Sequence, residues 1–159
     1  MVIEIDLTDA STKKACDKLN YYINSLPKRI VQFEKKLAEV GAAAARGAYG
    51  PSVTVSVVPY DGGKGVGYKV VANGNAVCFL EFGAGDLTDT SHPFASEVPF
   101  QVRPGSYSAV NSKQYSERGC WHFGGQIYFY VKPVRGLWEA HKAIRRDILK
   151  VANEVFSKK

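Results

Sequence analysis

The sequence predicts an α+β fold in which N-terminal helices and a C-terminal helix pack on one face of a small antiparallel β-sheet, with a long irregular loop. Apolar residues recur at helical spacing through the first 50 positions and again after position 136. Between positions 51 and 85 they alternate with polar residues, as in strands with one buried face. The length of 159 residues, of which 45% are hydrophobic, suits a single domain with its own core.

Residues 1–50 form the predicted helical part. Ser11–Asn24 is predicted to be a helix that Asp9 or Ser11 caps. Pro27 then interrupts this helix or starts a second one, because proline is tolerated in a first turn and not in a helix interior. A second apolar stripe runs from Ile30 to Ala44, and Gly50-Pro51 ends it.

Residues 51–85 are predicted to form a three-stranded meander. Valines alternate with polar residues from Val53 to Val57, and a glycine-rich turn leads to a returning strand over Tyr68–Ala72. Asn73-Gly74 is a strong signal for a tight turn, because both residues tolerate positive φ. A third strand over Ala76–Phe82 then completes the meander.

The second half of the chain begins with a long segment that has no clear pattern. Residues 86–125 are polar and rich in proline and glycine, and loops of this length in compact domains tend to be functional or partly disordered. A short aromatic strand is predicted over residues 126–132. A last helix follows over residues 137–157, with an apolar stripe from Ala140 to Val155.

The formal charge of +6 admits nucleic acid as a partner but does not require it. Basic residues cluster on the predicted first and last helices, and the acidic residues interleaved with them are typical of a solvated helix face. On the last helix, Arg145, Arg146 and Lys150 are the candidates for facing DNA. The alternative hypothesis is a small basic nucleic-acid-binding domain in which Tyr128 and Tyr130 stack on bases.

No targeting segment is recognisable. No apolar run approaches the roughly 20 residues of a membrane span, and the opening segment MVIEIDLTDA has acids where a secretory signal has basic residues. Cys16, Cys78 and Cys120 are odd in number and widely spaced, which favours reduced thiols over a disulfide framework. We therefore expect a protein that stays in the cytoplasm and has no membrane partner.

Patterns for catalysis or cofactor binding are weak, and we expect neither activity nor cofactor. The segment Gly62–Gly67 lacks the spacing of a phosphate loop, and no helix start follows it. A zinc site or a cysteine–histidine pair could use Cys120 and His122, but no second short ligand pair and no orienting acidic motif accompany them. The further residues on which such sites would draw are Cys78, His92 and His141.

The segment Phe79-Leu80-Glu81-Phe82-Gly83-Ala84-Gly85 resembles a signature of the tail-completion, or head–tail joining, proteins of long-tailed phages and prophages. In that family an aromatic–aliphatic–Glu-Phe-Gly-x-Gly segment follows N-terminal helices and a β-hairpin. Similar elements follow here in the same order: His92-Pro93, Gly119-Cys120-Trp121, and a Pro-x-x-Gly-hydrophobic-x-x-Ala element at Pro133–Ala140. The resemblance spans Leu26 to Phe156 and departs from the family pattern at Ala84, where Thr is commoner, and in the long loop before Trp121.

The resemblance implies a non-enzymatic structural protein of a phage or prophage virion, assembled in the cytoplasm of the bacterial host. Proteins of this family join the head connector, or neck, to the tail tube or the tail terminator. Their subunits form a homo-oligomeric ring around the virion axis. Weak contact with the phage DNA that passes the neck is a further expectation.

Several side chains are candidates for contacts between subunits under this interpretation. Glu81 alternates away from Leu80 and Phe82 in the predicted strand, so we expect it to face solvent or a basic group of a neighbouring subunit. Aromatic residues of the long loop are expected to become ordered against a partner. The candidate interface residues are Glu81, Phe94, Phe100, Tyr107, Tyr115 and Trp121.

Overall fold

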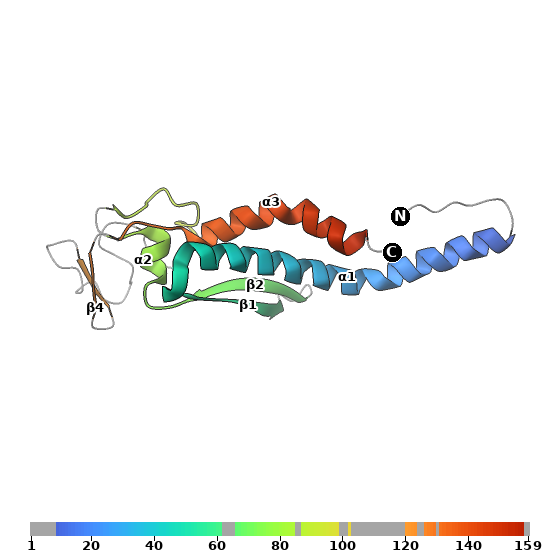
Figure 1. The fold of residues 1–159 in the computed structure, drawn as a ribbon, viewed down its shortest axis with the longest axis horizontal. Helices are drawn as coiled ribbons and strands as arrows, with labels where there is room; N and C mark the ends of the chain where they lie inside the picture. Colours follow the sequence, from blue (N-terminus) through green and yellow to red (C-terminus); the bar gives the residue numbers. More distant parts are fainter. Residues whose placement is uncertain are drawn as a thin grey trace.

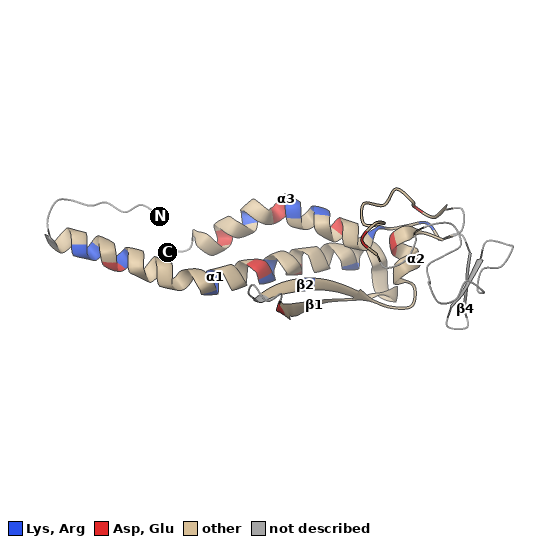
Figure 2. Ribbon diagram, turned by 180° about the vertical axis from the view of Figure 1, so that it is seen from behind, with Lys and Arg blue, Asp and Glu red and all other residues tan. Residues whose placement is uncertain are grey.

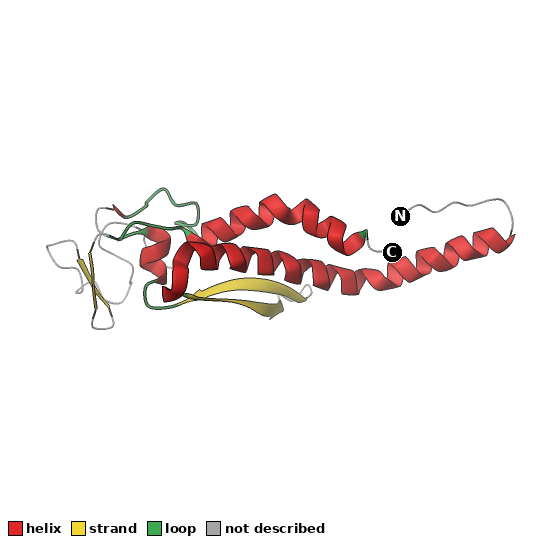
Figure 3. Cartoon of the chain, viewed as in Figure 1, coloured by secondary structure: helices red, strands yellow, loops and turns green. Residues whose placement is uncertain are grey.

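The longest element, helix α1 (Asp9–Tyr49), forms the middle layer of the fold. Helix α3 (Gly136–Phe156) runs along one side of α1, and the antiparallel hairpin of β1 (Thr54–Asp61) and β2 (Val66–Asn73) lies along the other (Figure 1). The computed structural model describes residues 9–61, 66–84, 87–98, 102, 120–123, 126–129 and 131–157. Over these residues the predicted α+β class is confirmed (Figure 3).

Helix α1 continues through Pro27, where the sequence predicted an interruption or a second helix. Proline has no N–H, so the carbonyl of Ile23, four residues earlier, loses its helical hydrogen bond there. The two predicted helices share one apolar stripe, however, and a continuous helix keeps that stripe in line with α3. The part of α1 after the proline is the part that packs in the main core.

The main core lies where α1 faces both the hairpin and α3. Ala42 and Ala45 of α1 are fully buried, and their small side chains let the neighbouring elements approach closely. Val53 and Val55 pack on them from the hairpin side, and Ala140 packs on them from α3. The tract of small residues in α1 thus sets the spacing of all three layers.

The C-terminal end of α3 is anchored to the middle of α1. Arg29 donates hydrogen bonds to the backbone carbonyls of Val155 and Phe156, at 3.2 Å each, and so satisfies groups that a helix end leaves open. The rings of Phe33 and Phe156 lie 5.6 Å apart beside this contact. The part of α1 before it, residues 10–26, projects past the end of α3 and past the hairpin (Figure 1). We call this projecting segment the α1 arm.

The hairpin has the alternating pattern that its sequence predicts. Val55 pairs with Ala72 and Val57 pairs with Val70. All four side chains belong to the core cluster against α1 or pack on it. The first two strands of the predicted meander are therefore confirmed.

The predicted third strand is wrong, because the structure has helix α2 (Val77–Phe82) at this position. A short apolar run fits either a strand or a buried helical turn, and periodicity alone cannot separate the two. Phe79 and Phe82, three residues apart, lie on one face of the helical turn and are both buried. Glu81 is buried as well, which a strand exposing every second residue would not allow.

A second hairpin consists of β3 (Cys120–Phe123) and β4 (Gln126–Phe129) and forms a sheet separate from β1 and β2. Its antiparallel register pairs Cys120 with Phe129 and Phe123 with Gln126. β4 falls within the predicted strand over residues 126–132. β3 falls within residues 86–125, where the sequence predicted only a loop, so that prediction needs correction.

The first part of the predicted loop is packed against the fold. The Asp89 N–H donates to the carbonyl of Phe82 at 2.6 Å, which turns the chain back after α2. Val98 and Val102 then pack on a second core cluster that contains Phe79 and Phe82. The 87–98 segment thus packs beside α2.

Charged residues of both signs follow the two long helices. Figure 2 shows Lys and Arg interleaved with Asp and Glu along α1 and α3. Within the described ranges, no helix combines the length and the apolar character that crossing a membrane requires.

Candidate functional site

The carboxylate of Glu81 is the centre of a buried polar cluster. Glu81 is only 2% exposed. It accepts a hydrogen bond from the hydroxyl of Tyr49 at 2.5 Å and others from the backbone N–H groups of Leu137 and Trp138, at 2.9 and 3.1 Å. The prediction that Glu81 faces solvent or a neighbouring subunit is therefore wrong.

Glu81 acts as the cap that α3 lacks in its own sequence. The N-cap residue Arg135 has left-handed backbone angles (φ 53°, ψ 46°) and makes no side-chain cap hydrogen bond. Leu137 and Trp138 are the second and third residues of α3, and these are the amides that an N-cap side chain normally satisfies. A carboxylate at this end also complements the positive end of the helix dipole.

His92 completes the cluster from the 87–98 segment. Its Nε2 atom lies 3.0 Å from the nearer Glu81 oxygen, and its side chain is fully buried. Its Nδ1 atom accepts a hydrogen bond from the N–H of Phe94 at 3.1 Å, so the ring N–H lies on Nε2, the nitrogen nearer Glu81. The Nε2 atom is within hydrogen-bond distance of Glu81 but is not aligned for a regular hydrogen bond.

The buried carboxylate changes the acidity of its neighbours. Burial, the hydrogen bond to Glu81 and the charge of Glu81 together raise the pKa of Tyr49 far above its usual range, so Tyr49 stays a neutral donor. Burial, followed by the charge of Glu81, also raises the pKa of the Cys78 thiol. Because the thiolate is the reactive form, Cys78 is a poor nucleophile at neutral pH.

An ion pair ties the 87–98 segment to the start of α3. Arg135 lies 2.5 Å from Asp89, whose other carboxylate oxygen accepts hydrogen bonds from the Ser91 hydroxyl and N–H at 2.8 and 3.3 Å. Burial alone would raise the pKa of Asp89. The hydrogen bonds from Ser91 and the charge of Arg135 nevertheless hold it below its usual value.

Two glycines are required by the geometry of this region. Gly83, after α2, has φ +82°, a conformation that residues with a side chain rarely adopt. A Cβ atom at Gly136, the first residue of α3, would lie 2.4 Å from the ring of Tyr49. The absence of a side chain at Gly136 therefore lets Tyr49 reach Glu81.

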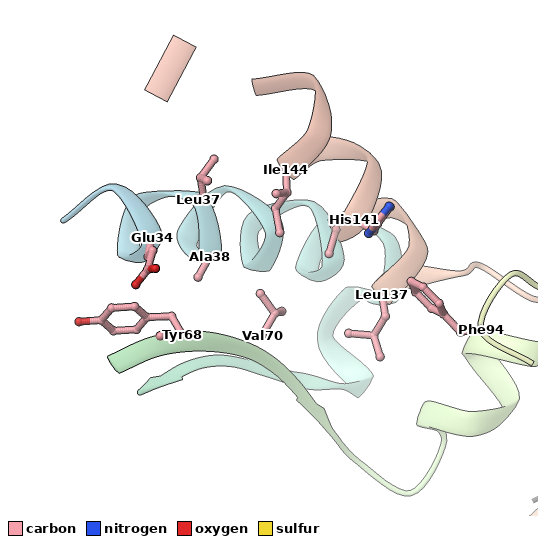
Figure 4. Close-up of a pocket in the computed structure, with 11 residues that line it drawn as sticks. Glu34, Leu37, Ala38, Tyr68, Val70, Phe94, Leu137, His141 and Ile144 are labelled. Atoms are coloured by element: carbon pink, nitrogen blue, oxygen red, sulfur yellow. The ribbon is translucent and has the colours of Figure 1, made fainter. Parts of the chain in front are cut away.

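An open groove of about 530 Å³ lies beside this cluster, where β2, the first half of α3 and the middle of α1 meet (Figure 4). Its walls are mostly aliphatic and include Val70, Leu137 and Ile144. Glu34 lies on the α1 side, and its Oε2 atom is buried without a hydrogen-bond partner among the described residues. An unpaired carboxylate oxygen in such surroundings is costly, so the groove favours a cationic ligand group.

Aromatic rings border the groove at the end nearer α2. His141 stacks on Trp138 with ring centroids 5.1 Å apart, and Phe94 meets both rings edge-on at 5.5 and 5.8 Å. Phe94, a predicted interface residue, is half-buried here and lines the groove. It is therefore part of a surface that another molecule can reach.

The other predicted interface residues are not brought to this site by the described structure. Trp121 belongs to β3, and only its backbone is described. Phe100, Tyr107 and Tyr115 lie outside the described residues.

The candidate DNA-facing residues are exposed on α3. Arg146, however, donates two hydrogen bonds to Asp147, at 2.9 and 3.0 Å, and is therefore already paired with an acid. Arg145 and Lys150 are exposed on the same helix. The positive charge here is thus broken by an acidic group rather than continuous.

Within the part of the chain that the structure describes, no three His, Cys, Asp or Glu side chains come together as a metal site requires. The side chains of Cys120 and His122 lie outside that part, as do those of Tyr128 and Tyr130.

Sequence reasoning missed the groove, the role of Tyr49 and the burial of Glu81. One signal was available for Glu81, which is the single charged residue in the apolar run Val77–Phe82. A lone acid in such a run is compatible with burial if partners satisfy it. No local signal identified those partners, because Tyr49 and Leu137 are distant in the sequence.

Compared with protein-family models, characterised proteins and solved structures, the chain shows no significant match.

Proposed function

We propose that this chain is a non-enzymatic structural protein of a phage or prophage virion, which joins the head connector to the tail. Its partners are the connector or neck protein on one side and the tail tube or terminator protein on the other. Several copies act together as a ring, assembled in the host cytoplasm. The ring encloses the path of the DNA, with which Arg145, Arg146 and Lys150 make at most weak contact.

The observation that carries the proposal is the meeting of motifs that lie far apart in the sequence. Glu81 comes from the Glu-Phe-Gly segment, His92 from the His-Pro element and Leu137 from the Pro-x-x-Gly-hydrophobic element. The carboxylate of Glu81 contacts both of the other residues, at 3.0 and 2.9 Å. Three of the four motifs on which the family resemblance rests therefore form one structural unit, which supports reading them together.

The shape of the molecule suits an assembly subunit. The α1 arm projects from the body (Figure 1), and its Leu19 and Ile23 side chains are 44% and 50% exposed. An apolar pair on a projecting element is available for contact with a neighbouring chain. Such a feature is expected in a subunit that contacts neighbours.

The proposal is tested by removing the gene from a phage or inducible prophage that encodes this chain. We expect separate DNA-filled heads and complete tails in electron micrographs, and joined particles when the wild-type chain is supplied in trans. A chain with Glu81→Ala, which destabilises the fold, should restore fewer joined particles than wild type. Normal infectious virions in the absence of the chain would refute the proposal.

A further inference from the structure

The α1 arm continues an apolar stripe that the body of the protein covers elsewhere. Between Phe33 and Ala44 this stripe faces α3. The contact with α3 ends near Arg29, which bonds the last carbonyls of α3. Leu19 and Ile23 lie one helical turn apart on the same stripe, in the part that projects beyond α3 (Figure 1). Both are about half exposed, so a partner can contact the stripe there.

The charge of the α1 arm is predominantly positive. Lys13, Lys14 and Lys18 outnumber Asp17 between residues 10 and 26, and all four side chains are exposed. Lys18 directly precedes Leu19, so an ammonium group flanks the two apolar side chains. The arm therefore presents an aliphatic pair with a cation beside it.

The groove beside β2 offers the complementary surface. Its walls are aliphatic, and its one carboxylate, on Glu34, has a buried oxygen without a partner among the described residues (Figure 4). The arm cannot reach the groove of its own chain, because the arm and one wall of the groove belong to the same continuous helix α1. A second copy of the chain can supply the arm.

We propose that the α1 arm of one copy docks into the groove of the next. Leu19 and Ile23 enter between α1, β2 and α3 of the neighbour, and the ammonium group of Lys18 pairs with the carboxylate of its Glu34. This is the mode in which a helix lays apolar side chains four residues apart into a groove. The contact joins two different patches, so it propagates from copy to copy and closes into a ring if the rotation between copies allows.

The experiment measures self-association of the purified full chain by sedimentation velocity over a range of concentrations. We expect the wild type to form oligomers larger than a dimer. Leu19→Asp with Ile23→Asp, which removes the arm contact, should give monomers. Glu34→Lys, which places a repelling cation in the groove, should also give monomers. A wild type that stays monomeric at every concentration would overturn the inference.

Mixing the two variants gives the sharpest result. The Glu34→Lys chain keeps a functional arm and the Leu19→Asp/Ile23→Asp chain keeps a functional groove, so a one-to-one mixture should form a heterodimer and nothing larger. This recovery also shows that both variants are folded. If arms instead paired with arms, Glu34→Lys alone would associate like wild type and the mixture would not recover association, and the inference would be rejected.

A charge exchange and a matched control complete the test. Lys18→Glu should weaken association by about tenfold or more, and its combination with Glu34→Lys in one chain should restore it. Tyr21→Asp is the control, because Tyr21 is 72% exposed and lies on the opposite side of the arm, two residues from both Leu19 and Ile23. Loss of association in this control would contradict the assigned face.

The inference deepens the proposed function, since it names the contact between copies in the ring. The two can fail separately. If the purified chain does not associate while its deletion still leaves heads and tails unjoined, only the arm-in-groove contact is rejected. If association follows the pattern above while virions form normally without the chain, only the role in the virion is rejected.

Discussion

At the scale of single residues, the carboxylate of Glu81 determines how α3 begins. Three elements meet at it, because Tyr49 ends α1, Glu81 lies in α2, and Leu137 and Trp138 start α3. The N–H of Trp138 is one of the amides that a helix start leaves open, and the N–H of Leu137 also donates to the Tyr49 hydroxyl at 3.2 Å. One side chain therefore joins the ends of three helices.

Glu81→Ala should lower the free energy of unfolding by about 3–5 kcal/mol, because it removes the buried acceptor on which the donors from α1 and α3 converge. Urea denaturation followed by circular dichroism measures this change. Glu81→Gln, which keeps the shape and some of the hydrogen bonds, should fall between Ala and wild type. The control is Glu97→Ala, an exposed glutamate in the 87–98 segment, whose loss should change stability little. Equal denaturation midpoints for Glu81→Ala and Glu97→Ala would contradict the assigned role.

Asp89 makes the attachment of the 87–98 segment sensitive to acid. Its pKa in the folded protein lies below the value of about 3.9 expected in the unfolded chain. Its contribution to stability is therefore complete above about pH 4 and is lost as the pH falls through the folded-state pKa.

Asp89→Asn should accordingly be less stable than wild type at neutral pH, and the difference should shrink as the pH falls below about 4. Urea midpoints of the two proteins at a series of pH values measure this difference, and other titrating carboxylates largely cancel in the comparison. A stability difference that is constant across the acidic range would mean that the Arg135 contact contributes nothing through the charge of Asp89.

At the scale of elements, α1 is one helix although its sequence contains the signal for two. Pro27 is exposed and lies where the α1 arm joins the packed part of the helix. Its missing N–H weakens the helix at this point. The angle at which the arm leaves the body therefore depends on a position that the core does not hold directly.

Pro27→Ala should stabilise the protein by about 2 kcal/mol, because it restores a donor for the carbonyl of Ile23 and removes the clash of the proline ring. The greater conformational freedom of the unfolded alanine chain offsets part of this gain. Urea denaturation measures the change, and the matched control is Asn24→Ala, an exposed substitution one turn away. A drop in stability on Pro27→Ala would mean that the native helix requires the proline geometry.

At the scale of the whole molecule, three layers form an elongated body and place different surfaces at different ends. The α1 arm lies at one end, and α2, the 87–98 segment and β4 lie toward the other (Figure 1). The groove lies between them, beside the aromatic rings of Phe94 and His141. Separate contact surfaces on one subunit are what a head-to-tail assembly requires.

The charged outer face of α3 provides a whole-molecule test of the nucleic-acid alternative. If this face binds phosphates, log affinity for duplex DNA falls linearly with log salt, and Lys150→Ala lowers the slope by about 1. Lys69→Ala, a matched exposed lysine on the hairpin, should leave the slope unchanged. We expect only weak binding, since Asp147 already pairs with Arg146. Tight binding that survives high salt would point to a DNA-binding domain instead.

The sequence by itself determined the elements whose patterns are long. The helical stripes and the alternation from Val53 to Val57 each depend on neighbours in the chain, so they are readable locally. The α+β class followed from them. The stretch Val77–Phe82 was too short for its period to be decisive, and a strand was predicted where α2 forms.

Only the tertiary structure decided the position of Glu81, the continuity of α1 and the existence of the groove. Each depends on partners far away in the sequence: Tyr49 and Leu137 for the carboxylate, α3 for the helix stripe, and β2 for the groove wall. A charged residue is stable inside a protein when several distant donors converge on it. That convergence is a property of the packed chain and has no counterpart in the local sequence.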